Sequence, residues 1–260
     1  MPYLQPKNTQ EGIRELHPPS ESPTQQRTLS SSKNPIPNST IPPKETMSLA
    51  PQLSAVYNNF QKNAPAQISQ TINIANSDFE YAFKTQTIIK VGDKLPSFAL
   101  NDALGKEVTS TELLKNGPLL ISFYRGEWCP FCNLALRSLQ LNLENFQAKG
   151  VTLVAISPEL PDTSLSTIDK NELKFPVLSD VGNKFARQLG IIFPMPDSMR
   201  PTFKAFGHDL VARNGDDSFE VPVPATLLVD GQGLVRNTYI NPHYWERIEP
   251  STALEWINEL

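Results

Sequence analysis

The feature that most constrains this chain is a dithiol segment, CPFC at residues 129–132, placed between two apolar runs. The run before it, residues 119–124, is almost continuously apolar and has the length of a central parallel strand. After the dithiol, residues 133–146 carry Leu and Phe at spacings of three and four, which predicts a helix. A second apolar run follows at residues 151–156. Strand, helix and strand therefore predict one right-handed parallel unit, with both cysteines at the turn into the helix.

The pattern around this unit predicts an α/β domain over residues 91–260, with helices flanking a mixed sheet. The segment 225–239 contains two apolar runs separated by Asp-Gly-Gln-Gly, a sequence that favours an antiparallel hairpin. Further short strands are predicted near residues 100 and 175–178, and helices are predicted from Asp180 to Leu189 and from about Ser251 onward.

Residues 191–220 are rich in Pro, Gly and Asp and are too many for a plain connection. We expect them to form a covering loop with short helices, and this loop could be one wall of a substrate pocket. Trp128, Phe203 and Phe206 could make such a pocket apolar, although core packing is the favoured role for each phenylalanine.

The first third of the chain has a different composition. Residues 1–46 are predicted to be a disordered extension, because runs rich in Pro and Ser neither propagate a helix nor bury much apolar surface. Residues 47–90 are predicted to be a helical or linker segment. Apolar residues between 49 and 60 fall at helical spacing, and after Pro65 the chain is either a second helix packed on the core or a linker.

Charge and hydropathy exclude several classes of function. The formal net charge of -4 is small and mixed in sign, which argues against a nucleic-acid or anionic membrane surface as partner. No apolar run approaches the roughly 18 residues of a membrane helix. The N-terminus shows no apolar core of a secretory signal, and two cysteines three apart cannot staple a secreted scaffold. We therefore expect a cytoplasmic protein.

The dithiol itself predicts redox chemistry. Cys129 is expected at or just before the first helical turn, Pro130 at the first helical position, and Cys132 one turn deeper, near enough for a disulfide. The helix N-terminus favours a thiolate. Arg125 is either a surface charge or a group whose permanent charge stabilises the thiolate or a bound oxidant. Trp128 is expected to form one side of the site and to limit access of water.

Other titratable residues are weaker candidates. Arg200 and Arg213 are further possible cations for the site. The histidines, His17, His208 and His243, lack the paired spacing of metal ligands, so we expect no metal ion and no other cofactor. His243 is expected to be an exposed polar residue. The alternatives to a redox dithiol are a buried apolar cysteine pair and a zinc site.

Residues 123–132 (FYRGEWCPFC) resemble the active-site segment of peroxiredoxin-like proteins in the alkyl hydroperoxide reductase and thiol-specific antioxidant (AhpC/TSA) superfamily. The resemblance implies a thioredoxin-like, peroxiredoxin-type fold. It also implies thiol-dependent reduction of hydroperoxides, with thioredoxin or glutathione as electron donor. Further resembling segments lie at residues 178–182, 215–218, 222–226, 241–242 and 247–250.

The register of this resemblance contains departures from the family. Arg125 takes the position of a family proline, Cys129 that of a threonine, and Cys132 that of the peroxide-attacking cysteine. The family's peroxide-polarising arginine would fall at or near Pro224. That residue is either an ordinary strand-start proline or the counterpart of the cis-proline that faces the dithiol in thioredoxin-like oxidoreductases, and we expect the cis form. The dithiol also resembles that of glutaredoxins.

The first functional hypothesis is a thioredoxin-dependent thiol peroxidase that reduces hydrogen peroxide or organic hydroperoxides through a Cys129/Cys132 dithiol–disulfide cycle. Family register favours Cys132 as the attacking cysteine, whereas an expected outward orientation favours Cys129, so the order stays open. The alternatives are a thioredoxin- or glutaredoxin-like disulfide oxidoreductase without peroxidase activity and a non-enzymatic redox sensor. The sequence does not indicate an oligomeric state.

Overall fold

The computed structural model describes residues 48–84 and 87–260. The predicted disordered extension, residues 1–46, lies outside the described residues. None of the helices in the described ranges is both long and apolar enough to cross a bilayer.

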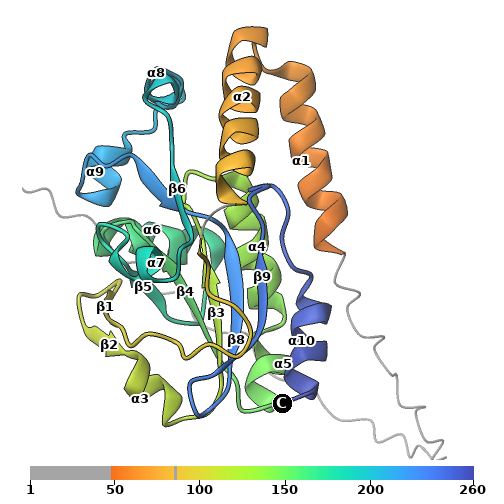
Figure 1. Ribbon diagram of the computed structural model, residues 1–260, viewed down its shortest axis with the longest axis vertical. Coiled ribbons are helices and arrows are strands. Elements are labelled where there is room, and N and C mark those ends of the chain that lie inside the picture. The colour runs from red at the N-terminus through yellow and green to blue at the C-terminus, as the bar shows by residue number, and fades with distance from the viewer. Residues whose placement is uncertain (1–47, 85–86) are drawn as a thin grey trace, which may run out of the picture. The chain divides into compact units, whose positions relative to one another are not determined.

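The strands of the main sheet are β1 (Ala99–Asp102), β2 (Glu107–Thr109), β3 (Leu119–Phe123), β4 (Thr152–Ser157), β5 (Val177–Ser179), β8 (Ala225–Val229) and β9 (Val235–Ile240) (Figure 1). Their order in space is β2-β1-β5-β4-β3-β8-β9. β3, β4 and β5 are parallel to one another. This confirms the parallel pairing that the two apolar runs predicted for β3 and β4. β8 is antiparallel to both β3 and β9, which confirms the predicted hairpin and makes the sheet mixed.

Alternate residues of the central strands face two apolar cores, one on each side of the sheet. On β3, Leu119, Ile121 and Phe123 face one core, and Leu120 faces the other. All β3 residues are buried. A strand covered on both faces gains from an apolar side chain at nearly every position, which explains why this stretch of sequence does not alternate.

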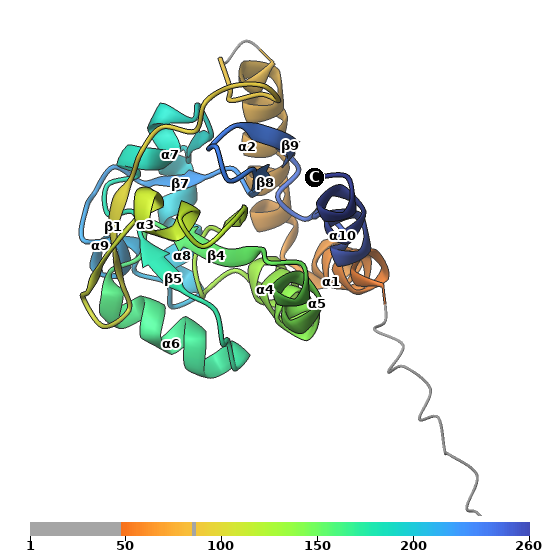
Figure 2. The same cartoon turned by 90° about the horizontal axis from the view of Figure 1, so that it is seen from below.

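Helices cover both faces of the sheet. The first face carries α1 (Leu49–Asn63), α4 (Pro130–Leu141), α5 (Leu143–Ala148) and α10 (Pro250–Asn258), which Figure 2 shows side by side. The core of the other face includes residues of α2 (Ala66–Phe83), α3 (Ser110–Leu114), α7 (Lys184–Gln188), α8 (Arg200–Ala205) and α9 (Leu210–Asn214). The remaining α-helix of the described ranges, α6 (Pro161–Asn171), connects β4 to β5.

The helices α1 and α2 form a hairpin whose arms pack on opposite cores. Leu49 and Leu53 of α1 lie in the core that contains α4, whereas an apolar stripe of α2, from Ile72 to Phe83, lies in the other. This stripe explains why the segment after Pro65 is a helix and not a linker. The hairpin belongs to the same compact unit as the sheet. The predicted domain boundary at residue 90 concerns independent folding and stays a prediction.

The long helix predicted after the dithiol is interrupted once. α4 and α5 separate at Asn142, whose backbone (φ -106°, ψ 4°) departs from helical geometry. The Asn142 side chain donates a hydrogen bond to the Ser138 carbonyl, 2.9 Å away. Such local bonding competes with helix propagation, which apolar spacing alone does not reveal.

The covering loop predicted at residues 191–220 is confirmed, and it is more ordered than expected. It contains α8, α9 and a short 3-10 helix, η1 (Asp197–Met199). Its ends, β6 (Ile192–Pro194) and β7 (Glu220–Pro222), pair as a separate antiparallel sheet. This pairing returns the chain directly to β8 beside the dithiol strand.

Candidate active site

The two cysteines lie where β3 has ended and α4 begins. Cys129 is the N-cap residue and Pro130 is the first helical residue, as predicted. Proline fits there because its missing N–H would have no partner within the helix. Cys132 lies in the first turn, and the Cys129 thiol is hydrogen-bonded to its sulfur. Both cysteines are unbridged in this structure.

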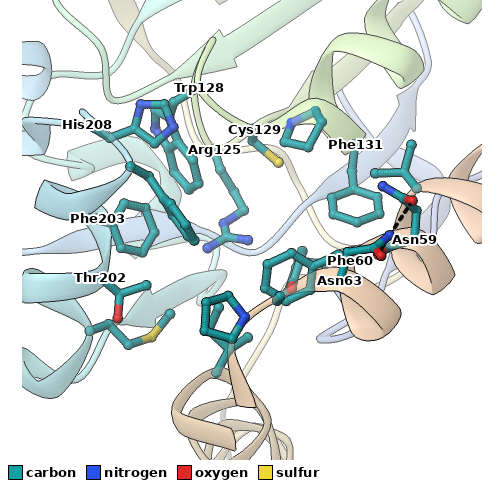
Figure 3. Close-up of a pocket in the computed structure, with 18 residues that line it drawn as sticks. Asn59, Phe60, Asn63, Arg125, Trp128, Cys129, Phe131, Thr202, Phe203 and His208 are labelled. Atoms are coloured by element: carbon teal, nitrogen blue, oxygen red, sulfur yellow. Dashed lines mark hydrogen bonds between the residues drawn. The ribbon is translucent and has the colours of Figure 1, made fainter. Parts of the chain in front are cut away.

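Both sulfurs are covered by the rest of the protein. Cys129 is 1% exposed and Cys132 is 0% exposed, so the prediction that Cys129 points outward into solvent is wrong. Both cysteines belong to the core that also contains Leu49 and Leu53 of α1, and Tyr244 packs against this core. Cys129 instead lines a pocket of about 510 Å³, whereas Cys132 is not among the lining residues (Figure 3). A small molecule that enters this pocket meets Cys129 first.

Hydrogen-bond donors converge on the Cys132 sulfur. The Arg125 backbone N–H donates to it at 3.4 Å, and Arg247 Nη2 donates at 3.5 Å. Burial alone would raise the pKa of Cys132, but the hydrogen bond from Cys129 and the Arg247 charge outweigh burial and lower this pKa to about 5. Burial, followed by the hydrogen bond to Cys132, raises the pKa of Cys129. The pair therefore shares one proton, and Cys132 holds the negative charge.

Arg125 is not a surface charge, because it is only 3% exposed. Its guanidinium carbon lies 4.5 Å from the ring centre of Tyr244 and 4.9 Å from that of Trp128, and Nη2 contacts Met195 Sδ at 3.6 Å. Its buried Nε atom has no hydrogen-bond partner. Within the described residues, no carboxylate pairs with this guanidinium. Arg125 points into the pocket beside Cys129 (Figure 3), where the N–H groups of its guanidinium can donate to a ligand oxygen.

The loop before the dithiol is held by charged residues from distant elements. The Glu127 backbone N–H donates to Glu159 Oε2 at 2.9 Å, and the Glu127 carboxylate pairs with Arg213 at 3.0 Å and with Lys170. Burial raises the pKa of Glu159 to about 7. These contacts fix the path of the backbone that delivers Arg125 and the dithiol to the pocket.

Gly126 adds a steric constraint to the same loop. Its φ is +146°, and a Cβ at this position would lie 2.4 Å from Trp128 Nε1 and 2.9 Å from Glu159 Oε1. Only glycine permits this close approach. The Trp128 ring can therefore lie against Gly126 and line the pocket, in edge contact with Phe203 at 4.9 Å between ring centres. Trp128, Phe203 and Phe206 all line the pocket. Phe203 also belongs to the core, as expected for it, whereas Phe206 is 46% exposed and does not take the expected core position.

The weaker cation candidates lie in other ion pairs. Arg200 pairs with Asp197 at 2.7 Å and with Asp217 at 2.6 Å. Arg213 pairs with Glu127 at 3.0 Å and with Glu159 at 3.4 Å, so it supports the loop before the dithiol.

The histidines take different positions. His208 lines the pocket. His243, expected to be exposed, is half-buried, stacks on Trp245 and lies 3.3 Å from Glu80. Within the described residues there is no cluster of three or more metal-binding side chains. His17 lies outside the described residues.

Sequence reasoning missed Arg247, Tyr244 and Met195, which meet the dithiol or Arg125 only through the tertiary fold. Arg247 belongs to the segment 247–250 that resembles the family, and only this resemblance could have pointed to it as a residue of the site. Residue spacing gave no hint for the other two, because each lies more than 50 positions from Arg125 in the chain.

The expectation of a cis peptide bond before Pro224 is wrong, because the described residues contain no cis peptide bond. Pro224 is buried one residue before β8, at the sheet edge where β3 ends. The Val223 N–H donates to the Ile191 carbonyl at 2.8 Å, and Ala225 already pairs with β3. The chain thus stays extended from β7 into β8, and the trans form, favoured by about 0.5–1 kcal/mol, is kept.

Residues 91–238, more than half of the chain, match the family model described as AhpC/TSA family. The chain belongs to this family. Curated relatives include a putative peroxiredoxin bcp of Buchnera aphidicola, 30% identical over 105 residues, which cover 40% of this chain and 66% of the relative. A chloroplastic peroxiredoxin Q of Gentiana triflora is 31% identical over 113 residues, covering 43% of this chain and 52% of that protein.

A third relative, the thiol-disulfide oxidoreductase ResA of Bacillus cereus, is 26% identical over 117 residues, covering 45% of this chain and 66% of its own length. The chain thus spans about half to two thirds of the length of these curated relatives. Among solved structures, peroxidoxin BcpB from Mycobacterium tuberculosis superposes with a TM-score of 0.53 at 19% identity, covering 66% of this chain and 98% of that chain. This likeness confirms the predicted thioredoxin-like, peroxiredoxin-type fold.

Proposed function

We propose that this AhpC/TSA-family protein is a thiol peroxidase that reduces hydroperoxides through Cys129 and Cys132. The observation that carries the proposal is the division of roles between the sulfurs. Cys129 lines the pocket, and Cys132 directly behind it holds the negative charge. The peroxiredoxins among the relatives support the same activity.

In the first step, the Cys129 sulfur attacks the terminal peroxide oxygen while its proton passes to the Cys132 thiolate, which acts as general base. The S–O bond forms and the O–O bond breaks. The departing oxygen takes the proton from Cys132 and leaves as an alcohol, or as water when the substrate is hydrogen peroxide. Cys129 is oxidised to a sulfenic acid. Arg125 stabilises the negative charge that develops on the departing oxygen.

In the second step, the regenerated Cys132 thiolate attacks the Cys129 sulfur. The S–S bond forms, the S–O bond of the sulfenic acid breaks, and the hydroxide that leaves takes a proton from solvent to become water. A dithiol donor, or two molecules of a monothiol donor, then reduces the disulfide and is itself oxidised. Thioredoxin or glutathione in this role is part of the proposal, as is a cytoplasmic location.

Two cysteine variants test the activity and the order of attack. Purified protein with hydrogen peroxide or cumene hydroperoxide and a coupled thiol-reducing system should consume NADPH. In Cys132→Ser, a sulfenic-acid probe should label Cys129 after one equivalent of peroxide. Labelling of Cys132 in Cys129→Ser, with none of Cys129 in Cys132→Ser, would assign the attack to Cys132. No peroxide consumption by the wild-type protein would refute the peroxidase.

A disulfide oxidoreductase is the second candidate, because one relative has that activity and the dithiol lies at a helix N-terminus. The burial of both sulfurs favours a small oxidant over a protein disulfide. Reduction of insulin without peroxide consumption would favour this candidate. A protein that turns over neither substrate but binds a partner only when oxidised would be a redox sensor.

A further inference from the structure

We infer that the α1–α2 hairpin selects the substrate, and that the pocket takes an organic hydroperoxide with a bulky apolar body in preference to hydrogen peroxide. This inference rests on the proposed peroxidase activity. It concerns the space beside Cys129 and the side chains that enclose it.

The size of the pocket is the first argument. Hydrogen peroxide has two oxygen atoms and occupies roughly 60 Å³, twice the share of one water molecule. The pocket holds about 510 Å³, within the range of sites that enclose organic molecules. A site that served only hydrogen peroxide would leave most of this space to water.

The chemistry of the walls is the second argument. Phe60 and Ile72 of the hairpin line the pocket together with Met199 and Phe203. Figure 3 shows Phe60 and Phe203 on different sides of Arg125. Arg125 is the only side chain with a permanent charge among the lining residues of the described chain, and it lies beside Cys129. The peroxide group of a ligand therefore meets sulfur and guanidinium, while the rest of the ligand meets hydrocarbon.

The origin of the hairpin wall is the third argument. The family match begins at residue 91, so α1 and α2 lie outside the segment that the family model describes. The hairpin also forms part of the pocket entrance: Asn59, Asn63 and Pro65 are exposed lining residues near its bend, and Phe206 on the opposite side is 46% exposed. The shape of the entrance thus depends on the bend between the two helices.

The matched pair Ala64→Phe and Ala66→Phe tests this inference in the full-length protein. Ala64 lines the pocket at the bend, whereas Ala66, two residues further, is exposed and faces away from this pocket. We expect the wild type to have a kcat/KM for cumene hydroperoxide about 100-fold above that for hydrogen peroxide. Ala64→Phe should lower the cumene value about 10-fold and leave the hydrogen peroxide value within about 2-fold. Ala66→Phe should change neither.

The outcomes distinguish a failure of the proposed substrate preference from a failure of the proposed peroxidase activity. A wild type that reduces hydrogen peroxide as well as cumene hydroperoxide would overturn the inference and leave the peroxidase intact. Equal losses for both peroxides in Ala64→Phe would overturn the role of the hairpin in selection. A wild type that reduces neither peroxide would refute the proposed function, and with it this inference.

Discussion

At the scale of single residues, the charge on Cys132 depends on two arginines from distant parts of the chain. Arg125 supplies a backbone N–H from the loop after β3, and Arg247 supplies a guanidinium from the segment before α10. A charge-assisted hydrogen bond to a buried sulfur favours the thiolate strongly, because little water competes for it. Reactivity of the dithiol at neutral pH is thus a property of the assembled site.

Replacing Arg247 by Gln should raise the pKa of Cys132 by about one pH unit, because an opposite charge near a thiolate has an effect of this order. The pH dependence of thiolate absorbance in the ultraviolet would measure the change. Since the pKa rises, the variant should lose thiolate at a higher pH than the wild type as the solution is acidified. Arg137→Gln, an exposed change on the same helix as Cys132, should leave the titration unchanged. Identical titrations for wild type and Arg247→Gln would contradict this account.

At the scale of elements, the hairpin is anchored by a carboxylate from the opposite end of the chain. Glu249, the N-cap residue of α10, accepts hydrogen bonds from the Ser48 hydroxyl at 2.6 Å and from the backbone N–H groups of Leu49 and Ala50 at 2.9 and 2.7 Å. The Glu249 carboxylate thereby gives hydrogen-bond partners to backbone N–H groups at the N-terminus of α1, where the Ser48 side chain makes no capping bond.

Glu249→Ala should destabilise the protein by about 1 kcal/mol, as measured by urea unfolding, because it removes this cap. Burial raises the pKa of Glu249, but the bonds from Ser48, Leu49 and Ala50 outweigh it and hold the pKa below the usual range. The stability that the ionised Glu249 contributes is therefore fully present above the unfolded-state pKa of about 4.3. It is lost as the pH falls through the lower pKa of the folded state. Glu255→Ala, an exposed change on α10, should lower the unfolding free energy far less. Equal losses in both variants would argue against the cap.

At the scale of the whole molecule, one buried carboxyl makes stability depend on pH near neutrality. Glu159 is 0% exposed, and burial raises its pKa to about 7 despite the Glu127 N–H and Arg213. The folded state thus binds this proton more tightly than the unfolded chain. The resulting stability is fully present below the unfolded pKa and is lost as the pH rises through about 7.

The variant Glu159→Gln resembles the protonated acid and should not show this loss. Between about pH 5 and pH 8, the unfolding free energy of the wild type should fall by about 2 kcal/mol relative to that of the variant. Denaturant unfolding across this pH range would measure it, with the exposed Glu144→Gln as control. Parallel pH profiles for wild type and Glu159→Gln would show that Glu159 does not titrate in this way.

Local patterns predicted the parts of the molecule that depend on neighbouring residues. The apolar runs gave β3 and β4, the turn sequence gave the β8–β9 hairpin, and the dithiol gave the start of α4. What depends on chain segments far apart in sequence was not predictable. The burial of Cys129, the Arg247 contact and the trans bond before Pro224 all follow from tertiary packing.

The covered position of Cys129 has a consequence for regeneration of the proposed enzyme. A thiolate that reduces a disulfide must approach along the axis of the S–S bond, and here that approach runs down the pocket. A low-molecular-weight thiol is small enough for a pocket of about 510 Å³. A folded donor protein is far larger, so we expect its sulfur to reach Cys129 only after part of the pocket wall moves. Recycling by a protein donor should therefore include the free energy of this opening, a barrier that oxidation by a small peroxide does not meet.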